Sequence, residues 1–490
     1  MAKRLSDLGL TPKSGGDVVV SDLAFDSRKV QAGTLFAALP GTRVHGGDFI
    51  QYALRMGAGA ILTDRAGAEI AATDLAATDA ALVVVEDAAD ALAHAAALFF
   101  GAQPETMVAV TGTNGKTSVA SFTRQIWEAL GVPAVNIGTT GVEGAFEAPG
   151  IHTTPEPVTL HRVLAEMGAD GVTHAAMEAS SHGLDQKRMD GVRLAAAAFT
   201  NLTQDHLDYH GTMEAYFEAK LRLFTGLLPD GGVAVVNLDD DHGLRVAEAC
   251  STRGIEVIGV AQYAEAALKI TGRRIDETGQ DVLFRWQGDA CQVRLNLIGA
   301  FQAMNVLTAA GLVIAGGEDP EDVFAVLHKM EGVRGRMQLA ARRSHGAPIY
   351  VDYSHTPDSL EVALKALRPH VLGRLVVVFG AGGDRDTAKR PLMGNAATLW
   401  SDVAFVTDDN PRTEDPAAIR AAVLAGCPEA TVVADRAEAI LRAVDMLEPG
   451  DALLIAGKGH ETGQQVGDVI YPFDDVEQAS VAVAALEGAI

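Results

Sequence analysis

The segment Gly112-Thr-Asn-Gly-Lys-Thr-Ser118 contains the residue types that hold a phosphate chain. It follows the apolar run Val108–Val110 and precedes a predicted helix over Thr117–Leu130. Glycines let successive backbone N–H groups converge on an anion, and the amino end of a helix adds partial positive charge. Lys116 would reach the β- and γ-phosphates, and the Thr117 hydroxyl would bind Mg²⁺. The predicted nucleotide-binding residues of this turn are Gly112, Thr113, Asn114, Gly115, Lys116, Thr117 and Ser118.

Other polar motifs follow at intervals along the chain. They are Thr153-Thr-Pro155, Met177-Glu-Ala-Ser-Ser-His182, Asn201-Leu-Thr-Gln-Asp-His206, Ala219-Lys220, Asn305, Gly335-Arg336, Asp352-Tyr-Ser-His355, Asp409-Asn-Pro-Arg412 and Gly457-Lys-Gly-His-Glu461. The phosphate turn is itself short, because Val110 stands where the general P-loop pattern has a glycine. Taken in order, the turn and these motifs resemble the Mur ligase family, whose members are ATP-dependent amide-bond ligases of peptidoglycan precursor synthesis.

The resemblance implies that an amide forms from a carboxylate and an amine. A carboxylate is a poor electrophile because it is an anion with a bad leaving group, so ATP first converts it to an acyl phosphate. That step brings two anions together and needs fixed cations and phosphoryl-transfer geometry more than a nucleophilic side chain. By resemblance, we expect the chain to add meso-2,6-diaminopimelate to UDP-N-acetylmuramoyl-L-alanyl-D-glutamate.

Two Mg²⁺ ions beside the phosphates are also implied. Glu178 ends the apolar stretch Ala175–Met177 and offers the oxygen ligand that Mg²⁺ prefers; the alternative is a surface glutamate at a strand end. By resemblance, Glu178, His206 and Thr117 bind the metal. Lys220 as an ammonium would be repelled there, so we expect the carbamylated lysine of the family (N6-carboxylysine), an anionic ligand, rather than an ordinary helix lysine. The catalytic set implied in this way is Lys116, Glu178, His206 and Lys220.

The resemblance also assigns contacts to each substrate. Further nucleotide contacts are expected from Asn305, Arg336 and Asp352. Contacts to the UDP-linked substrate are expected from Phe25, Ser27, Thr42, Arg43, Val44, Thr153, Thr154, Ser180, Gln186 and Arg188.

The motif Asp409-Asn-Pro-Arg412 bears on the choice of amino acid. Diaminopimelate differs from lysine by one carboxylate beside its far amine, and a guanidinium suits bidentate binding of a carboxylate. Asn-Pro favours a turn, and a turn after a strand would present Arg412. By resemblance, Glu461 faces the far ammonium. The expected diaminopimelate site consists of Arg385, Asp409, Asn410, Pro411, Arg412, Gly457 and Glu461.

Regular elements must position these residues. Short apolar runs such as Leu375–Phe379 and Val403–Val406 alternate with alanine-rich amphipathic stretches, which predicts parallel sheets covered by helices, an α/β fold. A length of 490 residues suggests about three domains. The resemblance makes them a UDP-substrate domain at 1–87, a central P-loop-type ATP-binding domain with a parallel sheet at 88–335, and a Rossmann-like amino-acid-binding domain at 336–490. We expect a helix at Ala88–Phe100 and the first strand of the last domain at Tyr350–Asp352.

Charge and composition limit the partners. The formal net charge is −25, which repels polyphosphate backbones and anionic lipid and therefore disfavours nucleic-acid and membrane partners. No targeting signal or membrane-spanning segment is evident, so we expect a cytoplasmic monomer that binds small molecules. The cysteines Cys250, Cys291 and Cys427 are far apart with no ligand-spaced histidine, which predicts reduced, buried residues rather than a zinc site.

Other interpretations stay open at this point. A folylpolyglutamate-synthetase-like or other Mur-type ligase shares the phosphate turn, but Asp-Asn-Pro-Arg together with Gly-Lys-Gly-His-Glu is not expected there. A non-catalytic nucleotide-binding regulator on the same fold would not need Lys116, Glu178, His206 and Lys220. The glycines of Gly380–Arg385 could suggest a dinucleotide site, but Arg385 replaces the third glycine of that pattern, which disfavours it.

Overall fold

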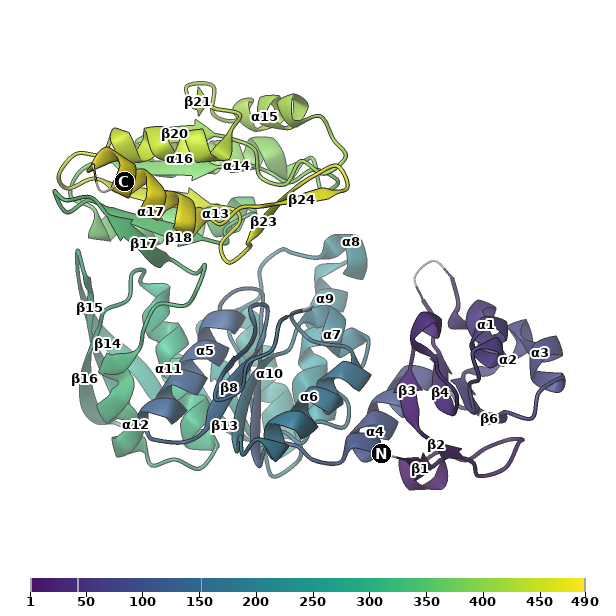
Figure 1. Cartoon of the computed structure of the whole chain (residues 1–490). Coiled ribbons are helices and arrows are strands. Elements are labelled where there is room, and N and C mark those ends of the chain that lie inside the picture. Colours follow the sequence, from purple (N-terminus) through teal and green to yellow (C-terminus); the bar gives the residue numbers. More distant parts are fainter. Residues whose placement is uncertain (1, 42–43, 151, 489–490) are drawn as a thin grey trace. The chain divides into compact units, whose positions relative to one another are not determined.

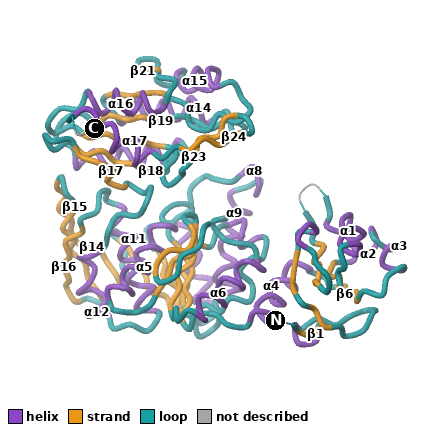
Figure 2. The backbone as a smooth tube through the Cα atoms, viewed as in Figure 1, coloured by secondary structure: helices purple, strands orange, loops and turns teal. Residues whose placement is uncertain are grey.

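The computed structural model describes residues 2–41, 44–150 and 152–488. Its contacts divide the chain into two units: unit 1 is Met1–Lys269 with Leu307–Phe324, and unit 2 is Ile270–Val306 with Ala325–Ile490. Strands and helices alternate through most of both units, as Figure 1 and Figure 2 show, and the sheets are largely parallel. The predicted α/β fold class is confirmed.

The first part of unit 1 is a small parallel sheet with helices on both faces. Its strands pair in the order β3-β4-β5-β6. Leu92 and Phe99 of α4 pack on one face, and Ile50 and Ala53 of α1 pack on the other. The elements are β1 (Lys3–Arg4), β2 (Val19–Val20), β3 (Asp22–Ala24), β4 (Thr34–Ala38), α1 (Ile50–Arg55), β5 (Ala60–Thr63), α2 (Arg65–Ile70), α3 (Ala72–Ala76), β6 (Ala81–Val84) and α4 (Ala88–Phe100). The predicted helix at Ala88–Phe100 is confirmed.

The second part of unit 1 is a larger sheet in the order β13-β12-β11-β7-β10-β8-β9, in which only the edge strand β9 is antiparallel among these. Met107 and Ala109 of β7 pack against Leu160 and Leu164 of α6, while α5 contacts β7, β8 and β10 on the other face. The elements are β7 (Thr106–Thr111), α5 (Lys116–Ala129), β8 (Ala134–Gly138), β9 (Gly141–Gly144), α6 (Pro157–Ala169), β10 (His174–Glu178), α7 (Ser181–Asp185), β11 (Ala196–Phe199), α8 (Leu207–His210), α9 (Met213–Arg222), β12 (Val233–Asn237), α10 (Asp241–Thr252) and β13 (Glu256–Ala261).

Three strands and two helices follow β13 in the sequence, and the first of these strands, β14 (Leu268–Asp276), pairs with β13 in parallel. β15 (Gly279–Trp286) and β16 (Asp289–Leu295) form a hairpin, which follows β14. The helices that follow are α11 (Phe301–Ala315) and α12 (Pro320–Val326).

Unit 2 contains a sheet in the order β17-β18-β22-β19-β20-β21, whose central strands β18, β22 and β19 are buried on both faces. In β19, Val377 packs on the side of α13 and α14, whereas Val376 and Val378 pack on the side of α16 and α17. Such strands are apolar throughout, which is why they are visible as continuous runs. The elements are β17 (Gln338–Arg342), β18 (Pro348–Asp352), α13 (Pro357–Leu367), β19 (Leu375–Phe379), α14 (Lys389–Trp400), β20 (Val403–Val406), α15 (Pro416–Leu424), β21 (Thr431–Val432), α16 (Arg436–Asp445), β22 (Ala452–Ala456), β23 (Gly463–Val466), β24 (Val469–Pro472) and α17 (Asp475–Leu486).

Two expectations need correction. Tyr350–Asp352 lies in a strand, β18, but β17 precedes it and pairs with it antiparallel, so it is not the first strand. Cys291 is only partly buried, unlike Cys250 and Cys427, because it lies on β16 at the edge of its sheet. All three cysteines are free thiols.

Among the helices in the described part of the chain, none has both the length and the apolar character needed to cross a bilayer.

The buried sheet of unit 2 gives a test of the packing. Leu454→Ala on β22 removes a fully buried side chain and should lower the free energy of unfolding by about 2–5 kcal/mol. Leu399→Ala on α14, where the side chain is 71% exposed, is the matched control and should change it by about 0.5 kcal/mol or less. Urea denaturation of both variants measures the two values. Equal losses would contradict the described core.

Candidate active site

The phosphate turn in unit 1 has a geometry that only glycine permits. Gly112 has φ +148°, and a Cβ there would lie 1.9 Å from Thr200 Oγ1. Gly115 has φ +90° and precedes the first turn of α5. Both positions would strain or clash with any other residue. The turn therefore leads from β7 directly to the amino end of α5, as an anion site requires.

Neighbouring backbone holds the turn in place. Asn201, which follows β11, accepts from Thr113 N through its carbonyl (2.9 Å) and from Asn114 N through Oδ1 (2.9 Å). Lys116 Nζ donates to Gly112 O (3.0 Å) and Thr113 O (2.8 Å). The ammonium therefore lies over the turn, where the phosphates are expected.

Glu178 lies beside the turn because β7 and β10 are adjacent parallel strands, with Val110 opposite Glu178. The carboxylate is 1% exposed. Oε2 accepts from Thr117 Oγ1 (3.0 Å), and Oε1 accepts from Thr139 N (2.8 Å). Gly138 leaves room for it, since a Cβ there would lie 2.0 Å from Oε1.

A hydroxyl and a carboxylate in contact suit Mg²⁺, which is commonly bound through one or two carboxylates together with substrate phosphates and water. A cage made only of protein is not expected for such an ion, and among the described residues no three His, Cys, Asp or Glu side chains form a metal-binding group. Thr117 and Glu178 therefore fit a magnesium ion that is shared with the nucleotide.

His206 and Lys220 lie in the same region of unit 1. His206 has φ +52°, and its ring centroid is 4.8 Å from that of His182; burial is the main cause that lowers its pKa. Lys220, on α9, is 1% exposed, and its Nζ donates to Gly112 O (2.8 Å) and lies 4.4 Å from the centroid of the Tyr216 ring. Burial, aided by the charge of Lys116, holds the pKa of Lys220 well below its usual range. Lys220 is thus no ordinary surface lysine on an amphipathic helix.

Five of the residues expected to contact the UDP-linked substrate form one network: Thr153, Thr154, Ser180, Gln186 and Arg188. Thr154 Oγ1 donates to Glu178 O (2.8 Å) and is 3.1 Å from Ser180 Oγ. Arg188 donates to Thr154 O (2.9 Å) and to Gln186 Oε1 (2.7 Å). Thr153 joins through Thr139, with 3.1 Å between their hydroxyl oxygens. This network is continuous with the carboxylate beside the phosphate turn.

The other expected contacts to the UDP-linked substrate that the structure describes lie in loops after strands of the first sheet. Phe25 and Ser27 follow β3, and Val44 comes after β4; since the two strands are parallel neighbours, all three follow the same edge of the sheet. Phe25 and Val44 are exposed, as ligand contacts in an open site would be. Thr42 and Arg43 lie outside the described residues.

The remaining nucleotide residues, Asn305, Arg336 and Asp352, belong to unit 2. Asn305 is buried and donates to Gln302 Oε1 (3.1 Å). The Arg336 guanidinium lies 4.8 Å from the centroid of the Tyr353 ring. Asp352 accepts from Met337 N (2.7 Å) and Ser354 N (2.9 Å), so its carboxylate fastens the loop before β17 to the end of β18.

The expected diaminopimelate residues of unit 2 gather at the carboxyl ends of three adjacent strands. Arg385 follows β19, Asp409 follows β20 and Gly457 follows β22, and the strands pair in the order β22-β19-β20. Crevices beyond the carboxyl ends of parallel strands are the usual ligand sites of open α/β sheets. This end of the sheet is therefore the candidate amino-acid pocket.

Hydrogen bonds fix the pocket side chains. Asn410 Nδ2 donates to Glu461 Oε2 (2.9 Å), and Asn410 Oδ1 accepts from Gln465 N (2.9 Å). Arg412 has φ +51°; its backbone N donates to Gln465 O (3.1 Å), and its Nη1 donates to Gly383 O (2.7 Å). The motif does form a turn that presents Arg412. Strand β23, through Gln465, thus holds both the Arg412 turn and the amide that contacts Glu461.

The glycines of the pocket allow close approach. A Cβ on Gly382 would lie 3.0 Å from Arg412 Nη1 and 3.9 Å from Arg385 Cγ, so this glycine is close to both arginine side chains. A Cβ on Gly457 would lie 2.7 Å from Asp409 Oδ2. A Cβ on Gly383 would lie 1.9 Å from Pro411 O.

Several contributors were not predicted from the sequence. Thr139 and Gly138 position Glu178, and Asn201 holds the turn. The sequence does contain a pattern that could have indicated Gly138 and Thr139. They form a Gly-Thr pair directly after an apolar run, as in the turns at other strand ends. Lys458, which lies inside a recognised motif, has a fully buried side chain that contacts Asn410 and Glu461.

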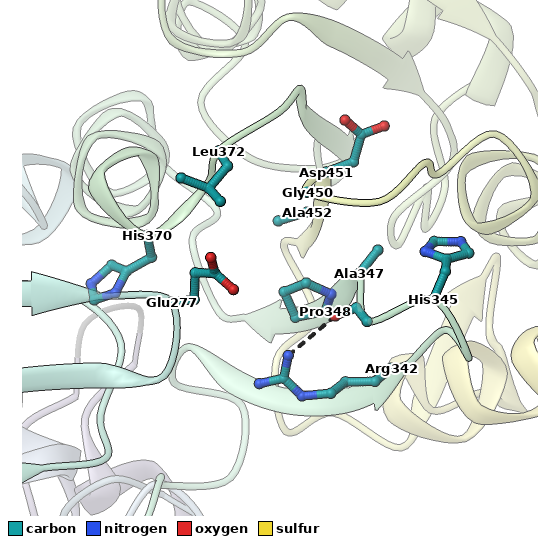
Figure 3. Close-up of a pocket in the computed structure, with 11 residues that line it drawn as sticks. Glu277, Arg342, His345, Ala347, Pro348, His370, Leu372, Gly450, Asp451 and Ala452 are labelled. Carbon is teal, nitrogen blue, oxygen red and sulfur yellow. Dashed lines mark hydrogen bonds between the residues drawn. The ribbon is translucent and has the colours of Figure 1, made fainter.

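A small cavity of about 90 Å³ lies at the opposite end of the unit 2 sheet. Figure 3 shows it beside Pro348 and Ala452, the first residues of β18 and β22, with Arg342 donating to Gly346 O at 3.3 Å. None of the predicted site residues lines it. Since ligands bind at carboxyl ends in such sheets, this cavity is not the candidate site.

Comparison with known proteins agrees with this geometry. Three family models match: "Mur ligase family, catalytic domain" over residues 20–100, "Mur ligase middle domain" over 110–313 and "Mur ligase, glutamate ligase domain" over 335–459. The UDP-N-acetylmuramoyl-L-alanyl-D-glutamate–2,6-diaminopimelate ligase of Caulobacter vibrioides is 50% identical, in an alignment that covers 100% of this chain and 99% of that protein.

Solved structures are similar as well. A structure of a UDP-N-acetylmuramoyl-L-alanyl-D-glutamate–2,6-diaminopimelate ligase matches with a TM-score of 0.71 and 32% identity, covering 99% of this chain and 100% of that one. The folylpolyglutamate synthase of Mycobacterium tuberculosis, complexed with ADP, matches with a TM-score of 0.62 and 18% identity over 79% of this chain and 92% of that one, which shows a shared fold alone. The chain belongs to the Mur ligase family.

Proposed function

We propose that this chain is the ATP-dependent ligase that joins meso-2,6-diaminopimelate to UDP-N-acetylmuramoyl-L-alanyl-D-glutamate. Half of its residues are identical, over its whole length, to a relative named for that reaction. The observation that carries the proposal is the arrangement around Gln465, whose backbone holds both the Arg412 turn and the Asn410 amide that contacts Glu461. A guanidinium and a carboxylate anchored to one strand match the carboxylate and ammonium at the far end of diaminopimelate.

The proposed reaction has two steps. A carboxylate oxygen of the UDP-linked substrate attacks the γ-phosphorus of ATP, and ADP leaves, which gives an acyl phosphate. The amine of diaminopimelate then attacks the acyl carbon, phosphate leaves with the former carboxylate oxygen, and the amine loses a proton. A positioned site lowers both barriers mainly by holding the reactants in line and by stabilising phosphate charge.

The residues at the phosphate turn serve the first step. The backbone N–H groups at the start of α5 bind the phosphates, and Lys116 places a positive charge over them. Thr117 and Glu178 would hold Mg²⁺, which when bound neutralises phosphate charge during the transfer. The Thr153–Arg188 network, joined to the backbone of Glu178, holds the carboxylate substrate beside them. The use of ATP is supported by the ADP bound in a structure of the same fold.

Lys220 is proposed to act as a carbamate. Its amine is enclosed, and the nearest ionised groups that influence it include the cation Lys116, so an ammonium there is unfavourable. Addition of the amine to CO₂ forms an N–C bond and releases a proton, and the product is an anion in place of a cation. With His206 it would then supply ligands for a second Mg²⁺.

The second step requires selection of the amine. Arg412 would bind the far carboxylate of diaminopimelate, and Glu461 would bind the ammonium beside it. Lysine would leave the guanidinium without a carboxylate to bind, and the loss of that charge-assisted contact should lower the acceptance of lysine by up to about a thousandfold. A cytoplasmic location, a monomeric state and the three domain boundaries remain predictions from the sequence.

A first test is the requirement for both substrates. With ATP and Mg²⁺ present, phosphate release should need the UDP-linked substrate and diaminopimelate together, because the acyl phosphate forms on one and is consumed by the other. A coupled phosphate assay with each component omitted in turn measures this. Release that is indifferent to both would favour a nucleotide-binding regulator.

The second test concerns Arg412. Arg412→Ala should raise the KM for diaminopimelate by about 100-fold or more, since a charge-assisted bidentate contact is lost, and should leave the KM for ATP unchanged. Arg442→Ala, on the exposed face of α16, is the matched control and should change neither constant. Steady-state kinetics with both substrates gives the values. A parallel rise in the KM for ATP would count against the assignment.

The third test concerns Lys220. Incubation at acid pH without CO₂ should remove the carbamate and suppress activity, and bicarbonate should restore it. Lys220→Ala should lose about 100-fold or more in kcat and recover part of it with added formate, which supplies a carboxylate in the vacated space. Lys116→Ala serves as the comparison, because formate cannot replace a cation. Activity that responds to neither bicarbonate nor formate would exclude the carbamate.

A further inference from the structure

Lys458 lies within the amino-acid pocket of unit 2, and the proposed reaction assigns it no role. Its side chain is 0% exposed, whereas that of its partner Glu461 is 32% exposed. Nζ donates to Glu461 Oε2 (3.0 Å) and to Asn410 Oδ1 (3.0 Å). A fully buried ammonium is costly unless it is paired and hydrogen-bonded, and the Lys458 ammonium meets both conditions.

The backbone around Lys458 directs it inward. Gly457 and Gly459 both have positive φ, +120° and +55°. A Cβ on Gly457 would lie 2.7 Å from Asp409 Oδ2, and a Cβ on Gly459 would lie 2.7 Å from the Cβ of Tyr353. The glycines thus permit a turn, directly after β22, that no other residue pair would adopt without strain. This turn places the ammonium between Asn410 and Glu461.

The three polar side chains form a closed triangle. Asn410 Nδ2 donates to Glu461 Oε2 (2.9 Å), which also accepts from Lys458. Asn410 Oδ1 accepts from both Lys458 Nζ and Gln465 N (2.9 Å), so the orientation of the amide is determined. Among the described residues, no donor bonds the other oxygen of Glu461, Oε1. The triangle therefore fixes one carboxylate oxygen and leaves the other for a ligand.

We infer that Lys458 is a positioning residue that aims Glu461 Oε1 at the far ammonium of the amino-acid substrate. The inference rests on the proposed function, since it takes diaminopimelate as the ligand. Without Lys458, the partly exposed Glu461 side chain would lose its fixed rotamer and bind water in place of the ammonium.

This role predicts a particular kinetic pattern. The far end of diaminopimelate does not react, so its contacts contribute to binding in the ground state and the transition state alike. Lys458→Met, which keeps the length of the side chain but removes the ammonium, should raise the KM for diaminopimelate about 10- to 100-fold. The change in kcat should be much smaller, and the KM values for ATP and for the UDP-linked substrate should not change.

The matched control is Lys365→Met on α13. Lys365 is 44% exposed and pairs with Glu361 one helical turn away, so the same substitution there should alter none of the constants. A double-mutant cycle with Glu461→Gln adds a readout that a merely structural lysine would not move. If Lys458 acts through Glu461, Lys458→Met should raise the KM for diaminopimelate far less in the Glu461→Gln background than in the wild type.

The outcomes separate the inference from the function on which it rests. Wild-type protein that fails to couple diaminopimelate overturns the proposed function itself. Wild-type coupling with an unchanged KM for diaminopimelate in folded Lys458→Met, or fully additive effects in the cycle, overturns the role of Lys458 alone. If the methionine variant does not fold, the same measurements are made on Lys458→Gln, which keeps an N–H donor. Failure of both variants to fold would make Lys458 a structural residue and would also overturn the inference.

Discussion

The structure of the proposed phosphate site depends on the pairing of two neighbouring parallel strands that end at the same level. β7 and β10 align Val110 with Glu178, so the turn after one strand meets the carboxylate at the end of the other. The 3.0 Å contact between Thr117 Oγ1 and Glu178 follows from that register. A shift by one residue would send the Glu178 side chain to the opposite face of the sheet. The proposed acyl-phosphate chemistry depends on this register, because it needs cations and a metal-binding carboxylate at one place.

The proposed amino-acid site of unit 2 also lies at the carboxyl ends of adjacent parallel strands. β22, β19 and β20 are adjacent, and the loops at their carboxyl ends supply Gly457, Gly382 and Asp409. Here the loops carry no phosphate turn. Instead, glycines at positive φ and non-glycine residues at positive φ, Asp384 and Arg412, bend the chain so that polar groups converge. Backbone conformations of this kind are costly and persist where surrounding contacts determine them, as Gln465 does for Arg412.

The strands whose burial requires a continuous run of apolar residues were predicted from the sequence. Leu375–Phe379 and Val403–Val406 match β19 and β20 residue for residue, because a strand covered on both faces must be apolar throughout. β14–β16 were not predicted, since Lys269, Arg273 and Arg274 interrupt β14 and an edge hairpin exposes alternate residues. The motifs predicted the candidate site residues, but not the residues that hold them in place. Lys458 in a glycine-rich loop would normally be taken for a solvated lysine, and only its contact with Asn410, distant in sequence, explains its burial.

The central claim is that the chain activates an unreactive acid by phosphoryl transfer before the amine attacks. Transfer of an isotopic label tests it most directly. UDP-N-acetylmuramoyl-L-alanyl-D-glutamate that carries ¹⁸O in its D-glutamate carboxylates is incubated with the protein, ATP, Mg²⁺ and diaminopimelate, and the released phosphate is analysed by mass spectrometry. An acyl phosphate requires that each phosphate leaves with one oxygen from the carboxylate, so labelled phosphate should form in step with the amide. Phosphate without ¹⁸O, released while amide forms, would contradict the account.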